Sequence, residues 1–73
     1  MNGNDYVLIY THNQRHRIML LKEFLLENGI SEVAEINKKG SMLLVGEIEL
    51  YVRKEEEEKA KKLVEEFDEK NED

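Results

Sequence analysis

The stretch LLENGISEV (residues 25–33) marks the point where a helix ends and a strand begins. A helix that runs to Asn28 needs a residue that tolerates a positive φ directly after its end, and Gly29 is such a residue. We expect Ile30 to fold back onto the last helical turn and complete a Schellman-type cap. The chain then reverses, and residues 31–37 are predicted to form a strand.

A first strand is predicted upstream, over YVLIYT (residues 6–11). This run is β-branched, aromatic and aliphatic, and it is too short for a helix. Strand alternation places Val7 and Ile9 on one face of the sheet. The opposite face then carries Tyr6, Leu8 and Tyr10.

An amphipathic helix is predicted between these strands, with Asn13 as its N-cap. Thr11 and Gln14 offer an alternative capping-box start two residues earlier. The apolar positions follow the spacing i, i+3, i+7 and have further apolar neighbours, so we expect more than a third of the helix circumference to be buried. The spaced residues are Ile18, Leu21 and Leu25, and their neighbours are Met19, Leu20, Phe24 and Leu26.

The segment KKGSMLLVGEIELYVRK (residues 38–54) predicts a β-hairpin. Turn residues occupy 38–41, and the second arm begins with the apolar residues 42–45. Gly46 either bends a long second arm with a bulge or ends a separate short strand, and both alternatives stay open. The arm then alternates with Ile48, Leu50 and Val52 on one face.

Residues 54–70 return to a helical period and predict a one-sided surface helix. Its apolar positions are Ala60, Leu63, Val64 and Phe67.

The predicted order is therefore β-α-β-β-α, an α+β ferredoxin-like fold in which a three-stranded sheet carries two helices on one face. A right-handed crossover is expected to make the first strand parallel to its sheet neighbour. The second arm of the hairpin pairs with both other strands, which leaves residues 6–11 at a sheet edge. We predict one domain over residues 1–73, with an ordered core at about 5–68 and a frayed acidic tail at 69–73. The expected core comprises Leu21, Leu25, Leu50, Val52, Leu63 and Phe67.

Composition excludes several classes of chemistry. The chain has no cysteine, so disulfides, thiol catalysis and iron–sulfur ligation are excluded. The net charge of −6 argues against a nucleic-acid partner, since such binding depends on Lys and Arg. The start resembles no signal peptide and no run could span a membrane, so we expect a cytoplasmic protein without a membrane partner.

The sequence resembles a small bacterial family of prokaryotic signal-transducing proteins, which is grouped by fold with the PII-like nitrogen-regulatory proteins. The resemblance covers roughly residues 6–68. Members often follow the capping Asn with an acidic residue and Ala, where this chain has QRHR, and the hairpin turn here is short and Lys-rich. The long nucleotide-binding loop of PII proteins is missing, so the resemblance implies a regulatory or binding module without ATP. It rests on Asn13, Leu25, Gly29, Ile30, Leu50, Val52, Ala60 and Leu63.

No residue pattern indicates an enzyme, a cofactor or a metal. His12 and His16 have the i, i+4 spacing of a helical metal pair, but His12 is expected to precede the helix. The carboxylates lie on charged helical faces or alternate outward, as Glu47 and Glu49 do. Acid–base catalysis needs two of them in one cleft, in different environments.

Two surfaces remain as candidates for binding. Cations in the first turn of a helix oppose its dipole, and a bound anion or small metabolite would offset that cost. This alternative site would combine Asn13, Arg15, Arg17, Lys38 and Lys39.

The leading hypothesis is an interaction module that acts through the uncovered sheet face or its edge. An exposed apolar and aromatic patch often marks an interface, and an unprotected edge strand can recruit another chain. A protein partner or a homodimer is therefore expected. The predicted partner surface comprises Tyr6, Leu8, Tyr10 and Tyr51.

Overall fold

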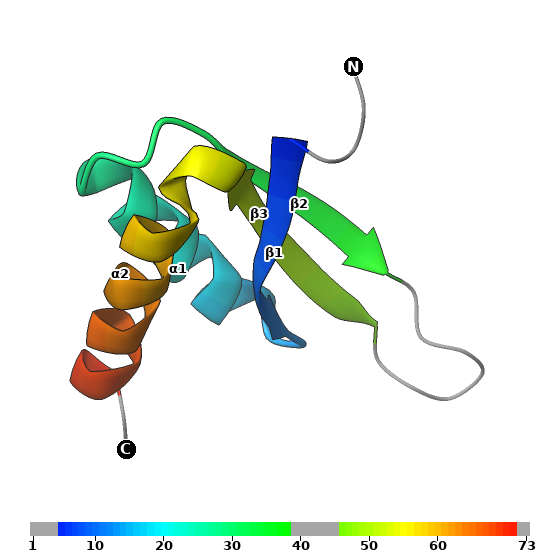
Figure 1. Ribbon diagram of the computed structural model, residues 1–73. Helices are drawn as coiled ribbons and strands as arrows, with labels where there is room; N and C mark the ends of the chain where they lie inside the picture. Colours follow the sequence, from blue (N-terminus) through cyan, green and yellow to red (C-terminus); the bar gives the residue numbers. More distant parts are fainter. Residues whose placement is uncertain (1–4, 39–45, 72–73) are drawn as a thin grey trace.

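The computed structural model describes residues 5–38 and 46–71, and its elements follow the order β-α-β-β-α (Figure 1). The predicted α+β ferredoxin-like class is thereby confirmed. A short 3₁₀ turn, η2, leads into the last helix. The bounds are β1 (Tyr6–His12), α1 (Arg15–Glu27), β2 (Val33–Lys38), β3 (Glu47–Arg53), η2 (Lys54–Glu56) and α2 (Glu57–Lys70).

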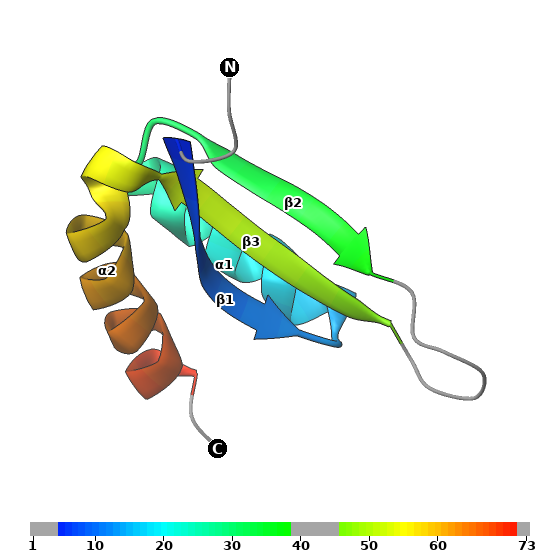
Figure 2. The same ribbon diagram turned by 45° about the vertical axis from the view of Figure 1, so that its right-hand side comes forward.

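The sheet has the strand order β1-β3-β2, and both outer strands pair antiparallel with β3 (Figure 2). This confirms that the second hairpin arm lies between the other two strands and that β1 is a sheet edge. The expectation that β1 would be parallel to its sheet neighbour is wrong. The helical crossover does make β1 and β2 run the same way, but β3 inserts between them.

The predicted turn at the end of α1 is confirmed. Gly29 has a φ of 101°. The Ile30 N–H donates to the Leu25 carbonyl at 3.1 Å, and the Gly29 N–H donates to the Leu26 carbonyl at 3.3 Å, which together form a Schellman cap. Ile30 is 2% exposed, so the same turn adds a side chain to the core.

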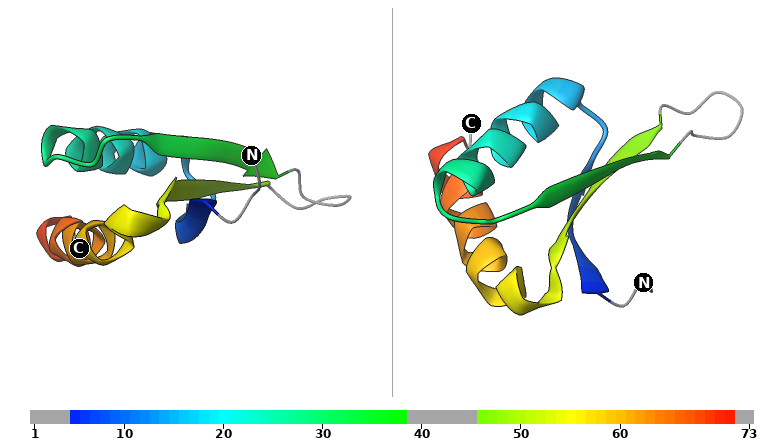
Figure 3. Two further views of the ribbon diagram at one scale, coloured as in Figure 1. Left: turned by 45° about the horizontal axis from the view of Figure 1, so that its top comes forward. Right: turned by 90° about the horizontal axis from the view of Figure 1, so that it is seen from above.

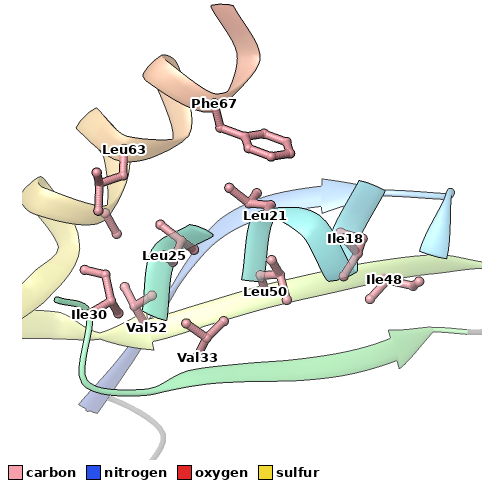
Figure 4. Packing of buried hydrophobic residues seen from close by; sticks show 11 residues of the cluster. Ile18, Leu21, Leu25, Ile30, Val33, Ile48, Leu50, Val52, Leu63 and Phe67 are labelled. Carbon is pink, nitrogen blue, oxygen red and sulfur yellow. The ribbon is translucent and has the colours of Figure 1, made fainter. Parts of the chain in front are cut away.

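Both helices lie on one side of the sheet (Figure 3), and the core fills the space between them and the strands (Figure 4). All six residues predicted for the core are buried. Val7 and Ile9 pack against it, as predicted for their face of β1. The buried cluster comprises Ile18, Leu21, Leu25, Ile30, Val33, Ile48, Leu50, Val52, Ala60, Leu63 and Phe67.

The hairpin turn begins later than predicted. Lys38 is the last residue of β2 and pairs with Glu47, so it does not begin the turn. The register continues without a shift to Val33 and Val52. The rest of the predicted turn and the apolar run before Gly46 fall at 39–45, outside the described residues.

The predicted burial of α1 is too wide. Its buried stripe consists of Ile18, Leu21 and Leu25. Met19, Leu20 and Leu26 remain 56%, 40% and 44% exposed, respectively. A two-layer fold covers only the side of α1 that faces the sheet and α2, so its outer side keeps apolar side chains in contact with solvent.

Candidate interaction surface on the open sheet face

The side of the sheet that the helices leave uncovered carries a row of apolar side chains. Leu50 and Val52 of β3 point into the core, so Tyr51 between them points to the opposite side. Tyr51 pairs with Leu8 on β1 and with Ala34 on β2. These three residues therefore cross all three strands on the open face.

A shallow hollow lies beside this row and is lined by Tyr6, Ala34, Ile36 and Tyr51. Its position follows from side-chain size, because Ala34 is much smaller than its neighbours. Ile36 is 46% exposed and Leu8 is 45% exposed. The open face thus combines accessible aliphatic groups with two aromatic rings.

The hydroxyl groups of both tyrosines are bound to carboxylates of the protein. The Tyr51 hydroxyl donates to Glu49 Oε1 at 2.8 Å, and the Tyr6 hydroxyl is 3.1 Å from both carboxylate oxygens of Glu32. These hydrogen bonds raise the pKa of each tyrosine above its ordinary value of 10.0. The guanidinium of Arg53 also lies 5.9 Å from the Tyr6 ring centroid. The rings are held in place with their polar ends satisfied.

Charged groups of both signs surround the apolar row. Lys38 Nζ lies 3.8 Å from Glu49, and Arg53 lies 3.7 Å from Glu32. Such exposed pairs add little stability on their own. They give the open face a mixed polar rim, which is the usual surrounding of a protein interface.

Tyr10 does not belong to this surface, although the sequence predicted it there. The register shifts between Leu8 and Tyr10, so Ile9 forms a β-bulge and Tyr10 pairs with the buried Leu50. The extra residue reverses the alternation. Tyr10 therefore packs against the core on the helix side, and the predicted surface keeps Tyr6, Leu8 and Tyr51.

The sequence did not predict Ala34 and Ile36 as part of this surface. Alternation along VAEINK could have found both residues. The inner set, however, contains Glu35 and Asn37 beside Val33, so no purely apolar face identifies the inside. Glu35 points toward the helices, as its ion pairs with Arg15 and Lys22 of α1 show.

Both outer strands carry features that oppose pairing with another chain. β1 has the bulge at Ile9, and β2 has the inward-pointing charge of Glu35. Bulges and inward charges are devices that protect sheet edges. The open face is therefore the stronger candidate for binding, and the edges are weaker ones.

Both arginines of the predicted anion site are already engaged. Arg15 donates to Glu35 at 3.1 Å and to Asn37 at 2.8 Å. Arg17 donates to Asp68 at 2.8 Å, and to the Tyr10 hydroxyl at 2.8 Å. The two guanidinium groups thus bind different carboxylates on different elements.

Asn13 and Lys38, two other members of that site, do not take the predicted roles. The helix begins at Arg15 with Gln14 in the N-cap position, so the predicted cap at Asn13 is one residue too early. Lys38 pairs with Glu49 on the open face, away from the helix side. Lys39 lies outside the described residues.

His12 has a local structural role in the turn before α1. Its Nδ1 accepts the backbone N–H of Gln14 at 3.1 Å, and its ring stacks on Tyr10 with centroids 6.1 Å apart. His16 lines the outer side of α1. Within residues 5–38 and 46–71, no group of three or more His, Asp or Glu side chains could hold a metal.

The chain was compared with family models, curated proteins and solved structures. No family model, curated protein or solved structure matches it. In the described part of the chain, neither helix has the length and hydrophobicity needed to cross a bilayer.

Proposed function

We propose that this chain is a small non-enzymatic regulatory or interaction module that binds a protein partner through the open face of its sheet. The observation that carries the proposal is the row of Leu8, Tyr51 and Ala34 across three strands, on a face that no other part of the described chain covers. Patches of this kind often mark protein interfaces. The resemblance to signal-transducing proteins is a further hypothesis in the same direction.

The two tyrosines suit this role for a physical reason. Tyrosine is enriched at the energetic centres of interfaces because it offers a large apolar area and few rotatable bonds. Here Glu49 and Glu32 hold the hydroxyls of Tyr51 and Tyr6 before any partner arrives. Less side-chain entropy is then lost on binding.

The shape of the surface indicates what the partner offers. The hollow over Ala34 is apolar and lies between two rings, so it fits an aliphatic or aromatic side chain of a partner. Lys38 and Arg53 on the rim can also contact acidic groups of a partner around that anchor. The edge strands β1 and β2 also offer unpaired backbone groups to a partner, but the bulge at Ile9 and the inward charge of Glu35 oppose such pairing.

The rival function, an anion-binding regulator at the start of α1, has less support. An anion there would have to compete with Glu35 for Arg15 and with Asp68 for Arg17. Titration with inorganic phosphate, followed by amide chemical shifts, tests it. Saturable changes in the amide chemical shifts of Arg15 and Arg17 would favour the anion-binding function. Unchanged chemical shifts at both residues would exclude it.

The proposal is tested by isolating the bound partner from the cells that make this protein, using the full chain and matched variants. Tyr51→Asp and Ala34→Arg should each abolish recovery of the protein that the parent chain retains. Arg15→Ala should leave its recovery unchanged, because that side chain lies on the helix side. Circular dichroism must show that all variants fold. Full recovery with both open-face variants would refute the proposal.

A further inference from the structure

A second apolar surface, on the outer side of α1, lies away from the open sheet face. Met19, Leu20 and Leu26 are the large apolar side chains that this helix exposes, at 56%, 40% and 44%. They line one groove along α1 together with His16, Lys22 and Glu23 of the same helix and Glu35 of β2. The three apolar side chains are not part of the core, since the buried stripe of α1 consists of Ile18, Leu21 and Leu25.

The order of residues along this surface is symmetric. Met19, Lys22, Glu23 and Leu26 follow the spacing i, i+3, i+4, i+7, which places them on one helical face. The two apolar residues lie at equal distances from the midpoint between Lys22 and Glu23. The basic and acidic residues occupy the two sides of that midpoint.

Such a pattern complements itself when the helix is reversed. In an antiparallel pair of α1 helices centred on the midpoint, Met19 of one copy meets Leu26 of the other. Lys22 of one copy then meets Glu23 of the other, and both contacts occur twice. A two-fold interface requires this relationship, in which residue i contacts j while j contacts i.

We propose that two copies of this chain associate across a two-fold axis through the outer faces of their α1 helices. The occupant is a second copy because the charges of this face match a reversed copy of itself. Glu35 does not prevent the new pair, since its contact with Lys22 is long, at 3.8 Å, and it keeps the 3.1 Å contact with Arg15. The inference is independent of the proposed function, which uses the other side of the sheet.

The contact is small, so the association is weak. α1 has 13 residues and is therefore about 20 Å long. An interface built on one helix of this length falls in the low-area class of transient contacts, below about 1,200 Å². We expect the monomer to predominate at low concentration and the dimer at high concentration.

Charge reversal tests both the partner and the orientation. Lys22→Glu and Glu23→Lys each place like charges opposite one another, so sedimentation should show each variant alone as a monomer at concentrations where the parent dimerises. An equimolar mixture of the two variants restores opposite charges at both contacts and should form a heterodimer. Glu66→Lys, a reversal at an exposed position on α2, is the control and should dimerise like the parent.

A second measurement does not depend on charge. Met19 and Leu26 are seven residues apart on α1, about 10 Å along the axis at 1.5 Å per residue. An isotope-filtered NOE between their methyl groups, in a mixture of labelled and unlabelled chains, must therefore arise between copies.

The expected result is this NOE, together with dimerisation that the single reversals abolish and their mixture restores. A parent chain that stays monomeric at millimolar concentration would overturn the inference. So would a dimer that is insensitive to both reversals but lost in Tyr51→Asp. That last result would assign self-association to the open sheet face and leave the proposed function standing.

Discussion

Replacing Leu25 by Ala tests the placement of the α1 core face, and the adjacent residue provides a matched control. Leu25 is fully buried, whereas Leu26 is 44% exposed on the same helix. Leu→Ala changes helix propensity little at either position. The difference between Leu25→Ala and Leu26→Ala therefore isolates burial.

The expected cost for Leu25→Ala is about 2–5 kcal/mol, because the substitution removes apolar contacts and leaves a cavity. A chain of 73 residues has a total unfolding free energy of about 4–11 kcal/mol. With an unfolding entropy of about 150 cal/mol/K for this length, the melting temperature should fall by about 13–33 °C. Leu26→Ala should cost less than about 1 kcal/mol.

Urea unfolding followed by circular dichroism measures both variants, at protein concentrations low enough to avoid self-association. The midpoint should shift strongly for Leu25→Ala while the slope stays that of the parent. Equal losses for the two variants would refute the assigned core face. A larger loss for Leu26→Ala would mean that the helix is rotated.

Substitutions at three further positions test local features. Gly29→Ala should lower the unfolding free energy by about 1 kcal/mol and Gly29→Val by more, because φ is 101°. The nearest atom to an added Cβ, Lys59 Nζ at 2.5 Å, ends a flexible side chain and can move away. Equal urea midpoints would contradict this. The hydrogen bond from Arg15 is the main factor that lowers the pKa of Glu35 below its ordinary value of 4.5. Ionised Glu35 therefore stabilises the folded chain above pH 4.5, and this stabilisation is lost as the pH falls through the lower pKa of the folded state. Glu35→Gln should therefore lose less stability between pH 6 and pH 3 than the parent, and equal losses would argue against this ion pair. Tyr10→Phe should lower the unfolding free energy by about 0.5–1.5 kcal/mol, because it removes the hydroxyl that accepts a hydrogen bond from Arg17. It should leave partner binding intact. A folded Tyr10→Phe variant that binds the partner poorly would show that Tyr10 belongs to the interface.

The sequence predicted the features that local chemistry determines. Gly29 was identifiable because a helix end favours a residue with positive φ, and the buried positions of α2 followed from their period of 3.6. The pairing of β3 with both other strands followed from the order of elements. Each of these features depends on a few neighbouring residues or on the order of the elements along the chain.

Features that depend on register were not predictable in the same way. A single extra residue at Ile9 moved Tyr10 to the other side of the sheet, and no Gly or turn residue marks that bulge. Apolar periodicity also predicted more burial for α1 than the fold provides, because it does not reveal how many layers cover a helix. Met19 and Leu26 were therefore expected to widen the buried stripe of this helix, and they are exposed.

Site-specific photo-crosslinking on the open sheet face tests the central proposal most directly. A benzophenone amino acid replaces Leu8 or Ile36 on the open face, or Glu66 on α2 as the control, in the cells that make this protein. We predict that both open-face positions yield one discrete adduct with a partner protein after irradiation and that position 66 does not. Adducts from position 66 with none from Leu8 or Ile36, in chains shown to be folded, would contradict the proposal.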